Sequence, residues 1–340
     1  MRTELHDQAG TPVSTETRFT APYVRSLVWD GDELVDWVAG GTRYSMQGES
    51  HDPCVRYAFS FDMAATLEGS GYSVICKRLG TKGLVLKDGH VLRDLNRAFY
   101  HAEAYEYPVA LFRLPSGRPA IVHCPDEYCR LRIDDLETGE VLASASDAAG
   151  DFFHSRLAVS PDGRWLASAG WMWHPVDDVA VYDLHAALAD GRTLDTPTRE
   201  LDVLTDRGNA AGFDRRNRVV ATGELFGDED TGVRGGSTVV RLAPGTGTPP
   251  ERIVVDTDSA FMAVGDDHLL LLAGHPRLLS LASGRVVAEW PGIETVVPAS
   301  AIQSDRHAWT PLAIDVPRAR LAIAHGGQVS VIAFDVPGLD

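Results

Sequence analysis

The feature that most restricts the fold of this chain is a short unit of strand, tight turn and strand that recurs along it. In the clearest copy, Leu157–Gly170, apolar residues alternate on both sides of a Pro161-Asp-Gly163 turn. A period of two is what β-strands require, and Pro-Asp-Gly is a turn signal. A further strand follows at Val179–Leu184. The unit therefore predicts an antiparallel sheet made of consecutive strands.

Weaker copies of this unit occupy much of the rest of the chain. They share apolar alternation around a turn followed by another strand, and they lie at 109–142, 213–242, 261–290 and 311–335. Before residue 105 the pattern is harder to read: 26–39 predicts a hairpin around Asp30-Gly31, and 72–92 predicts the outer strands of another unit. At roughly 40–45 residues per four-stranded blade, 340 residues accommodate seven or eight units. We settle on seven.

The Asp-Leu pair at the end of Val179–Leu184 occupies the place where WD40 repeats carry Trp-Asp, and residues 105–335 resemble bacterial WD40-like propellers. The resemblance implies an all-β fold, a single β-propeller of seven four-stranded blades of degenerate WD40-like type over residues 21–340. Residues 1–20 are a polar segment, either flexible or contributing to propeller closure. The competing architecture has two β-domains, the first ending near residue 100. Helical periodicity is nearly absent, with one short turn expected at 185–190.

Composition limits the possible partners and compartments. The formal net charge is −17 and no Lys/Arg-rich run occurs, which disfavours nucleic-acid binding. No apolar run approaches the roughly 20 residues of a membrane span, and residues 1–22 lack the apolar core of a signal peptide. Four cysteines are too few for a disulfide scaffold of this size. We expect a cytoplasmic monomer with reduced thiols and neither a nucleic-acid nor a membrane partner.

The propeller resemblance also implies where the loops lie. Loops leading into the innermost strand of a blade, and loops between its second and third strands, open on one face, which we name the loop face. Short turns such as Pro161-Asp-Gly163 and Glu137-Thr-Gly139 lie on the opposite, turn face. The loop face then receives the unusual side chains, where rigid strands present variable loops. The candidate ligand-binding residues are His101, Glu103, Tyr105, His154, Arg156, Trp171, Trp173, His174, Glu224, His307 and Trp309.

These residue types are compatible with several chemistries. Trp171 and Trp173 point the same way in an extended segment, so they either stack on a flat ligand, anchor a protein partner or cover a neighbouring blade. The histidines come from different blades, and their linear spacing does not show whether they converge on a metal or act as bases. Cys124 and Cys129 form half of a zinc motif at most, and we favour ordinary strand-end cysteines. Neither a metal nor a cofactor is predicted.

The sequence is best interpreted as a binding or interaction propeller that holds a protein partner or a small ligand at its loop face. This follows from the fold resemblance rather than from a recognised site. The alternative is an enzyme, a lyase, hydrolase or cyclase of bacterial metabolism, with its active site in an axial pocket at the same face. A flat protein-facing surface favours the first interpretation, and a deep axial pocket with converging histidines favours the second.

Overall fold

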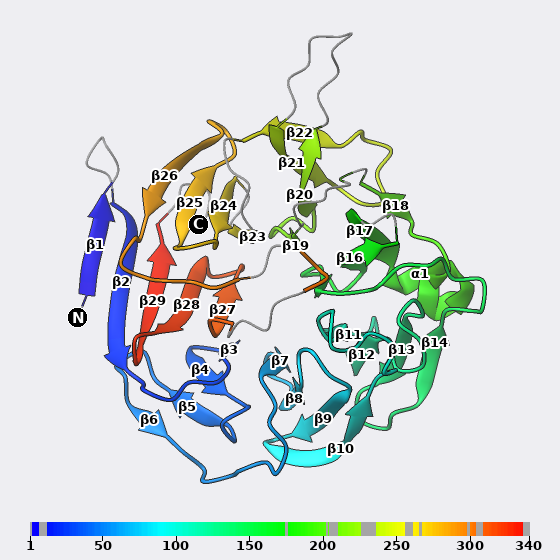
Figure 1. Cartoon of the computed structure of the whole chain (residues 1–340), viewed down its shortest axis with the longest axis horizontal. Helices are drawn as coiled ribbons and strands as arrows, with labels where there is room; N and C mark the ends of the chain where they lie inside the picture. The colour runs from blue at the N-terminus through cyan, green and yellow to red at the C-terminus, as the bar shows by residue number, and fades with distance from the viewer. Residues whose placement is uncertain are drawn as a thin grey trace.

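The computed structural model describes residues 2–6, 12–173, 176–201, 203, 210–225, 236–255, 261–264, 267–297, 300–303 and 309–335. The strands form seven antiparallel sheets arranged as blades around a central axis (Figure 1). This confirms the all-β, seven-bladed propeller. The first hundred residues supply two blades of the same ring, so the two-domain alternative is wrong.

The first three blades follow the chain in order, and in each of them sequential strands are neighbours in the sheet. Blade 1 contains β3 (Val28–Asp30), β4 (Glu33–Asp36), β5 (Thr42–Tyr44) and β6 (Ser50–His51). Blade 2 contains β7 (Met63–Leu67), β8 (Tyr72–Cys76), β9 (Lys82–Lys87) and β10 (His90–Asn96). Blade 3 contains β11 (Val109–Arg113), β12 (Pro119–His123), β13 (Arg132–Asp135) and β14 (Val141–Ser144).

The next three blades repeat this order. Blade 4 contains β15 (Leu157–Val159), β16 (Trp165–Met172), β17 (Val176–Asp183) and β18 (Arg199–Glu200). Blade 5 contains β19 (Ala211–Phe213), β20 (Val219–Leu225), β21 (Gly236–Leu242) and β22 (Glu251–Val254). Blade 6 contains β23 (Phe261–Val264), β24 (His268–Leu271), β25 (Arg277–Ser280) and β26 (Arg285–Glu289).

Blade 7 is assembled from both ends of the chain. Its inner strands are β27 (Leu312–Asp315), β28 (Arg320–His325) and β29 (Gln328–Phe334), and its outer strands are β2 (Pro12–Thr20) and β1 (Arg2–His6). β2 pairs antiparallel with β29, with Thr17 opposite Val331. The N-terminal strands thus complete the last blade and close the ring.

The apolar core lies between neighbouring blades rather than at one centre. Each buried cluster joins two adjacent sheets; one, for example, packs Val74 of blade 2 against Val109 and Ile121 of blade 3. Because both faces of a blade are covered, its middle strands are buried on both sides, as every residue of β8 is. Burial of apolar area at these interfaces is the main force that holds the ring together.

One short helix, α1 (Leu184–Ala189), follows β17, and a 3-10 helix (Gly191–Leu194) follows it. The carboxylate of Asp183 accepts hydrogen bonds from the backbone N–H groups of His185 and Ala186, which caps the helix. Leu184 and Ala187 pack into the core between blades 3 and 4. The helical turn expected near 185–190 is therefore present. No helix in the described residues is long and apolar enough to span a membrane.

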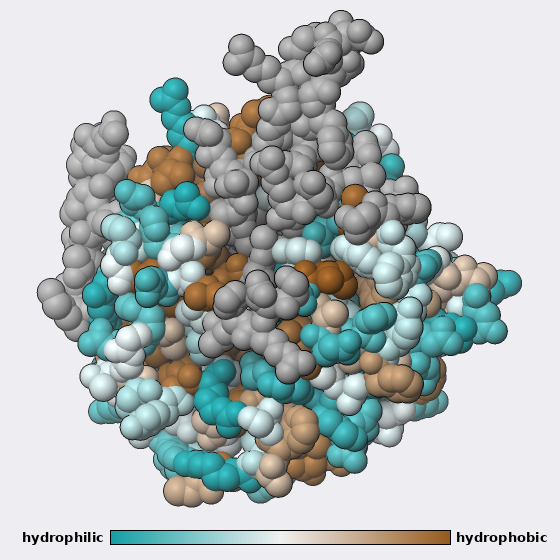
Figure 2. All heavy atoms as spheres, viewed as in Figure 1, coloured by the Kyte–Doolittle hydropathy of each residue, from teal (hydrophilic) through white to brown (hydrophobic). Residues whose placement is uncertain are grey.

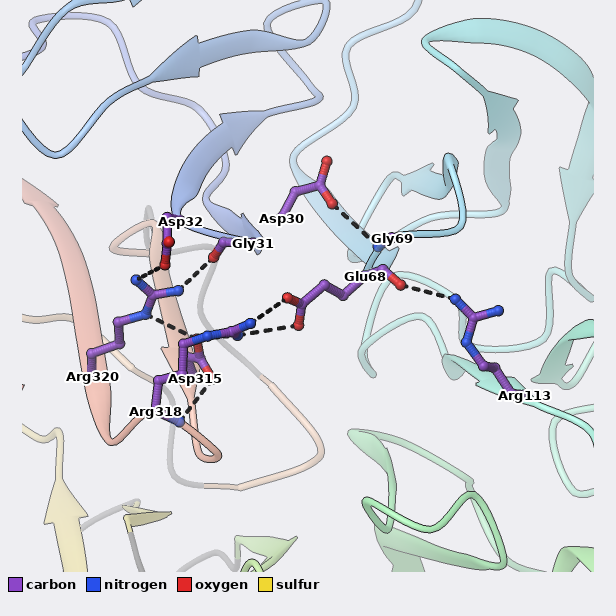
Figure 3. Close-up of polar contacts among 9 residues, drawn as sticks. All are labelled: Asp30, Gly31, Asp32, Glu68, Gly69, Arg113, Asp315, Arg318 and Arg320. Carbon is purple, nitrogen blue, oxygen red and sulfur yellow. Dashed lines mark hydrogen bonds and ion pairs between the residues drawn. The ribbon is translucent and has the colours of Figure 1, made fainter. Parts of the chain in front are cut away.

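The inner turns of the turn face are linked from blade to blade (Figure 3). In blade 7, the Arg320 guanidinium donates to the Asp32 carboxylate of blade 1 at 3.1 Å. In blade 3, Arg113 donates to the Glu68 carbonyl of blade 2 at 3.1 Å. The Gly69 N–H of blade 2 donates to Asp30 of blade 1 at 3.4 Å. Polar contacts thus connect four consecutive blades at this end of the axis.

Candidate functional site

An axial pocket of about 360 Å³ opens on the loop face. Most of its lining residues lie next to the beginnings of the innermost strands of blades 1 to 5 and 7, while Arg78 of blade 2 and Leu272 of blade 6 lie in loops between the second and third strands. This volume is at the lower end of the range for small-molecule sites. Its charged and aromatic lining consists of Arg25, Asp62, Arg78, Glu106, Arg156 and Trp309, and most of the remaining lining is apolar.

Arg78 is the best-positioned cation of the pocket. Its guanidinium makes a 2.9 Å ion pair with Glu106, and both side chains are largely buried. The same guanidinium lies over the indole ring of Trp309, 3.9 Å from the ring centroid. Stacking of a guanidinium on an indole leaves its edge N–H groups available to a planar acid. Arg78 is therefore held by an acid and an aromatic ring from two other blade connections.

Asp62 occupies the beginning of the innermost strand of blade 2. Its carboxylate accepts a hydrogen bond from the backbone N–H of Arg78 at 2.6 Å, and it forms an ion pair with the Lys77 ammonium. These contacts fix the loop that carries Arg78. Asp62 is thus engaged by a cation that does not line the pocket.

Arg25 is placed by a buried acid of its own blade. The carboxylate of Asp36 accepts hydrogen bonds from the backbone N–H groups of Arg25 at 2.7 Å and Ser26 at 3.0 Å. Burial raises the pKa of Asp36, while these N–H donors oppose that rise. The Arg25 guanidinium donates to the Phe61 carbonyl at 2.9 Å and the Ser60 hydroxyl at 3.2 Å. Arg25 therefore faces the pocket from an exposed position across the gap between blades 1 and 2.

Arg156 lies on the opposite side of the pocket, at the beginning of blade 4. Its backbone has a φ of +45°, in the left-handed region that residues other than glycine seldom adopt. Its guanidinium donates to the Ser300 carbonyl at 2.5 Å. Burial lowers the pKa of Arg156, and the negative charges of Glu106 and Asp177 oppose that change. The strained backbone places a desolvated cation at the axis.

Residues 300–303, which we name the crossing segment, run over the loop face. They belong to the connection between β26 and β27, which crosses in front of blade 7 toward the middle of the ring (Figure 1). The buried carboxylate of Asp177 accepts the Ala301 N–H at 2.8 Å, and Gln303 N–H donates to the Ala104 carbonyl at 2.7 Å. The crossing segment is therefore attached to blades 3 and 4, on the far side of the axis.

An aromatic cluster lies beside the pocket, at the loop-face junction of blades 3 and 4. Phe153 is its centre: its ring stacks on Tyr128 at 4.1 Å and meets Trp171 and Trp173 edge-on, each at 5.5 Å. Tyr105 also meets Phe153 edge-on at 5.3 Å, and burial raises its pKa to about 12. These rings form one continuous aromatic packing unit.

His154 lies in a separate cavity of about 150 Å³ between blades 3 and 4. Its imidazole is buried, with Nδ1 3.1 Å from the Ser168 hydroxyl, and it hydrogen-bonds with the backbone of Cys129. Burial lowers the pKa of His154 to about 3, so the ring is neutral at pH 7. The Cys129 thiol lines the same cavity, and burial raises its pKa, which disfavours the reactive thiolate.

The predicted site residues are distributed among these places. Arg156 and Trp309 line the axial pocket; Tyr105, Trp171, Trp173 and His101 belong to the aromatic cluster; His154 is in its own cavity. Glu103 lies 3.8 Å from His101. His174 and His307 lie outside the described residues, as does the side chain of Glu224. His101 and His154 do not line the axial pocket, and within the described residues no three His, Cys, Asp or Glu side chains form a metal site.

The pocket residues that the prediction omitted are Arg25, Asp62, Arg78 and Glu106. Arg25 and Asp62 each stand close before an innermost strand, as Arg156 does. A charged residue at the same place in several repeats is the signal that points to them. This signal is weak because β7, Met-Ala-Ala-Thr-Leu, has little apolar alternation, so the sequence does not mark where blade 2 begins.

Comparison with known proteins identifies the fold. No model of a known protein family matches the sequence, and no curated protein matches it. A solved streptogramin B lyase is similar in structure, with a TM-score of 0.53 and 8% identity over 95% of this chain and 98% of that chain. A catalytically inactive histidine-to-alanine variant of virginiamycin B lyase from Staphylococcus aureus, solved with quinupristin, has a TM-score of 0.52 and 10% identity over 98% and 99%. At these identities the similarity shows a shared fold.

Proposed function

We propose that this protein is a binding propeller whose axial pocket holds a small organic acid, an apolar body carrying one anionic group. The observation that carries the proposal is the presence of three arginines, Arg25, Arg78 and Arg156, around one pocket of about 360 Å³. The chain as a whole has a formal net charge of −17. A local excess of guanidinium groups in such an acidic protein favours an anionic ligand.

The charges of the pocket support an anion rather than a cation. Among the described residues that line the pocket, three are arginines and two are acids, Asp62 and Glu106. Asp62 is also engaged by the Lys77 ammonium, and Glu106 is paired with Arg78. Both of these acids are thus already engaged by cations, and a carboxylate or phosphate entering the pocket could use the planar donors of the arginines.

The remaining walls support an apolar body for the ligand. Leu27, Met63, Leu157 and Leu272 line the pocket from four blades, and the indole of Trp309 forms part of the wall. Burial of apolar ligand surface against these side chains would contribute about 25 cal/mol per Å². The combination of apolar walls with a few converging polar groups is typical of small-ligand sites.

The test is isothermal titration of a series of ω-phenyl carboxylates, from phenylacetate to 5-phenylpentanoate, each compared with its primary amide. A phenylalkyl phosphonate arm distinguishes a phosphate ligand from a carboxylate. We expect at least one acid to bind and its amide to bind at least tenfold more weakly. The substitutions Arg78→Met and Arg25→Met should each weaken the acid at least tenfold, whereas the matched control Arg192→Met, on the exposed 3-10 helix, should not. Equal binding of acid and amide, or no binding by any acid, would exclude the proposal.

The lyase alternative is supported by the structural similarity to streptogramin B lyase over nearly the whole chain. The inactive neighbour has lost a histidine, whereas no histidine is among the described residues that line the pocket here. Incubation with quinupristin, followed by mass spectrometry of the antibiotic, separates the two functions. A change in quinupristin that depends on the protein supports the lyase, and an unchanged antibiotic together with acid binding supports the binding propeller.

A further inference from the structure

A second surface of the loop face, distinct from the axial pocket, exposes several aromatic side chains. Phe99 is 85% exposed, Trp173 49% and Tyr100 45%. The His101 imidazole lies between the last two, 4.5 Å from the Tyr100 ring and 6.0 Å from the Trp173 ring. We name these four residues the aromatic patch. None of them lines the axial pocket. Large exposed aromatic side chains that gather in one place are typical of interaction surfaces.

The aromatic patch rests on a rigid base. Tyr100 stacks on Tyr128 at 5.1 Å, and Trp173 meets Trp171 edge-on at 4.9 Å. Both contacts lead to the buried ring of Phe153, which holds the cluster together. The exposed rings are therefore ordered before any partner arrives, so binding costs little side-chain entropy.

The surroundings of the aromatic patch are acidic. Exposed carboxylates on the loops of blades 3 and 4 are Glu103, Asp126, Glu127, Asp147 and Asp151. In the described part of these loops, the guanidiniums that contact them are those of Arg130, paired with Glu127 and Asp147, and Arg132, paired with Asp126. The loop face also shows hydrophilic side chains around much of its rim (Figure 2). The carboxylates outnumber the cations, so the rim of the patch carries net negative charge.

We propose that the aromatic patch binds a cationic, arginine-bearing segment of another protein. The electron-rich faces of Trp173 and Tyr100 attract a guanidinium, and the acidic rim increases the attraction and the rate of association. A purely apolar partner would not use the acidic rim, and an anionic partner would be repelled by it. This inference is independent of the axial pocket, because the two surfaces share no residue.

The test uses a fluorescein-labelled peptide of alternating Gly and Arg, compared with a peptide in which citrulline replaces every Arg. Citrulline keeps the shape and removes the charge. We expect anisotropy titrations to show at least tenfold tighter binding of the arginine peptide. Phe99→Ser and Trp173→Ala should each weaken that binding at least fivefold. Phe99 is almost fully exposed, so its substitution leaves the fold unchanged and keeps the test valid if Trp173→Ala destabilises the cluster.

Two matched controls separate the patch from general attraction between a polycation and an acidic protein. Tyr23, 86% exposed, is the aromatic control, and Tyr23→Ser should change binding less than twofold. Glu103→Gln combined with Asp151→Asn should weaken binding at least threefold, whereas Glu33→Gln combined with Asp88→Asn, on the turn face, should not. If the citrulline peptide binds equally well, or if patch and control variants lose affinity equally, the inference is wrong.

Discussion

The Arg318 guanidinium of blade 7 donates to the Glu68 carboxylate of blade 2, at 2.7 and 3.3 Å, although blade 1 lies between these two blades (Figure 3). The pair therefore spans a whole blade at the turn-face end of the axis. Both side chains are nearly half exposed, so solvent and salt screen the attraction. We predict that Glu68→Gln lowers the free energy of unfolding by less than about 1 kcal/mol. Urea unfolding at low and high salt measures this; a loss above 2 kcal/mol would contradict it.

Arg320 should behave differently, although it is only two residues away. Its side chain is buried, pairs with the buried Asp315 at 2.9 Å and lies 3.9 Å from the Trp29 ring centroid. Arg320→Met leaves Asp315 with fewer partners in a poorly solvated place. We predict a loss of about 3 kcal/mol, measured by urea unfolding in parallel with Glu68→Gln. Similar losses in the free energy of unfolding for Arg320→Met and Glu68→Gln would contradict the expectation that the buried contact contributes more than the exposed one.

Gly170 supports the wall of the aromatic cluster through close contact. A Cβ atom at this position would lie 2.3 Å from the Phe153 carbonyl oxygen and 2.5 Å from the Phe152 ring. We predict that Gly170→Ala lowers the stability by about 2 kcal/mol, because the backbone of blade 4 must move. Gly212 is the matched control, since it also lies in a strand and has no atom within 4 Å of an added Cβ. Thermal unfolding should show that Gly212→Ala is nearly neutral.

Because the His154 imidazole is buried in its neutral form, we predict that the stability of the protein depends on pH. Its pKa is about 3 in the folded protein and near 6.5 when exposed in the unfolded chain, so below pH 6.5 protons bind preferentially to the unfolded state. The stability contributed by the neutral imidazole is complete above pH 6.5 and is lost progressively as the pH falls toward 3. Between pH 7.5 and 5 the loss should be about 2 kcal/mol.

The measurement is chemical denaturation of the wild type and His154→Gln at both pH values. The fall in stability from pH 7.5 to 5 should be smaller in the variant, whatever its stability at pH 7.5. In an NMR titration, the His154 imidazole signal is the one that is missing from the His154→Gln variant. In the wild type, this signal should show no protonation down to pH 5. An equal fall in both proteins, or a His154 signal that titrates near pH 6.5, would show that the ring is not buried in a neutral form.

The repeat pattern predicted the fold because the strands of most blades are consecutive in the sequence and pair with their sequence neighbours. The hairpin of β15 and β16 around Pro161-Asp-Gly163, and that of β3 and β4 around Asp30-Gly31, are where the sequence indicated them. The exception is β7, whose sequence Met-Ala-Ala-Thr-Leu has small residues and weak alternation. Its residues are only partly buried, so selection for apolar side chains is weak there.

The site was less predictable because it is built at the axis from distant parts of the chain. Arg156 and Trp309 were identified from their type and loop position, and both line the axial pocket. Arg25 and Arg78 were not, because a loop arginine in a sequence carries no sign of whether it faces the axis or the rim. The contact of Arg78 with Trp309 depends on the connection between blades 6 and 7, whose path is a property of the closed ring.

The pairing of Thr17 with Val331 in blade 7 has a consequence for how the chain acquires its structure during synthesis. Blades 1 to 6 are each continuous in sequence and can form as they leave the ribosome. β2 precedes blades 1 to 6 in the chain and β29 follows them, so β2 must wait for its partner until all six blades have been synthesised. Until then the faces of blades 1 and 6 that pack against blade 7 remain uncovered and expose apolar surface, the condition in which large β-proteins aggregate. The entropic cost of this final closure grows only with the logarithm of the loop length. Pairing β2 with β29 therefore affects the time needed to complete the ring more than the stability of the folded ring.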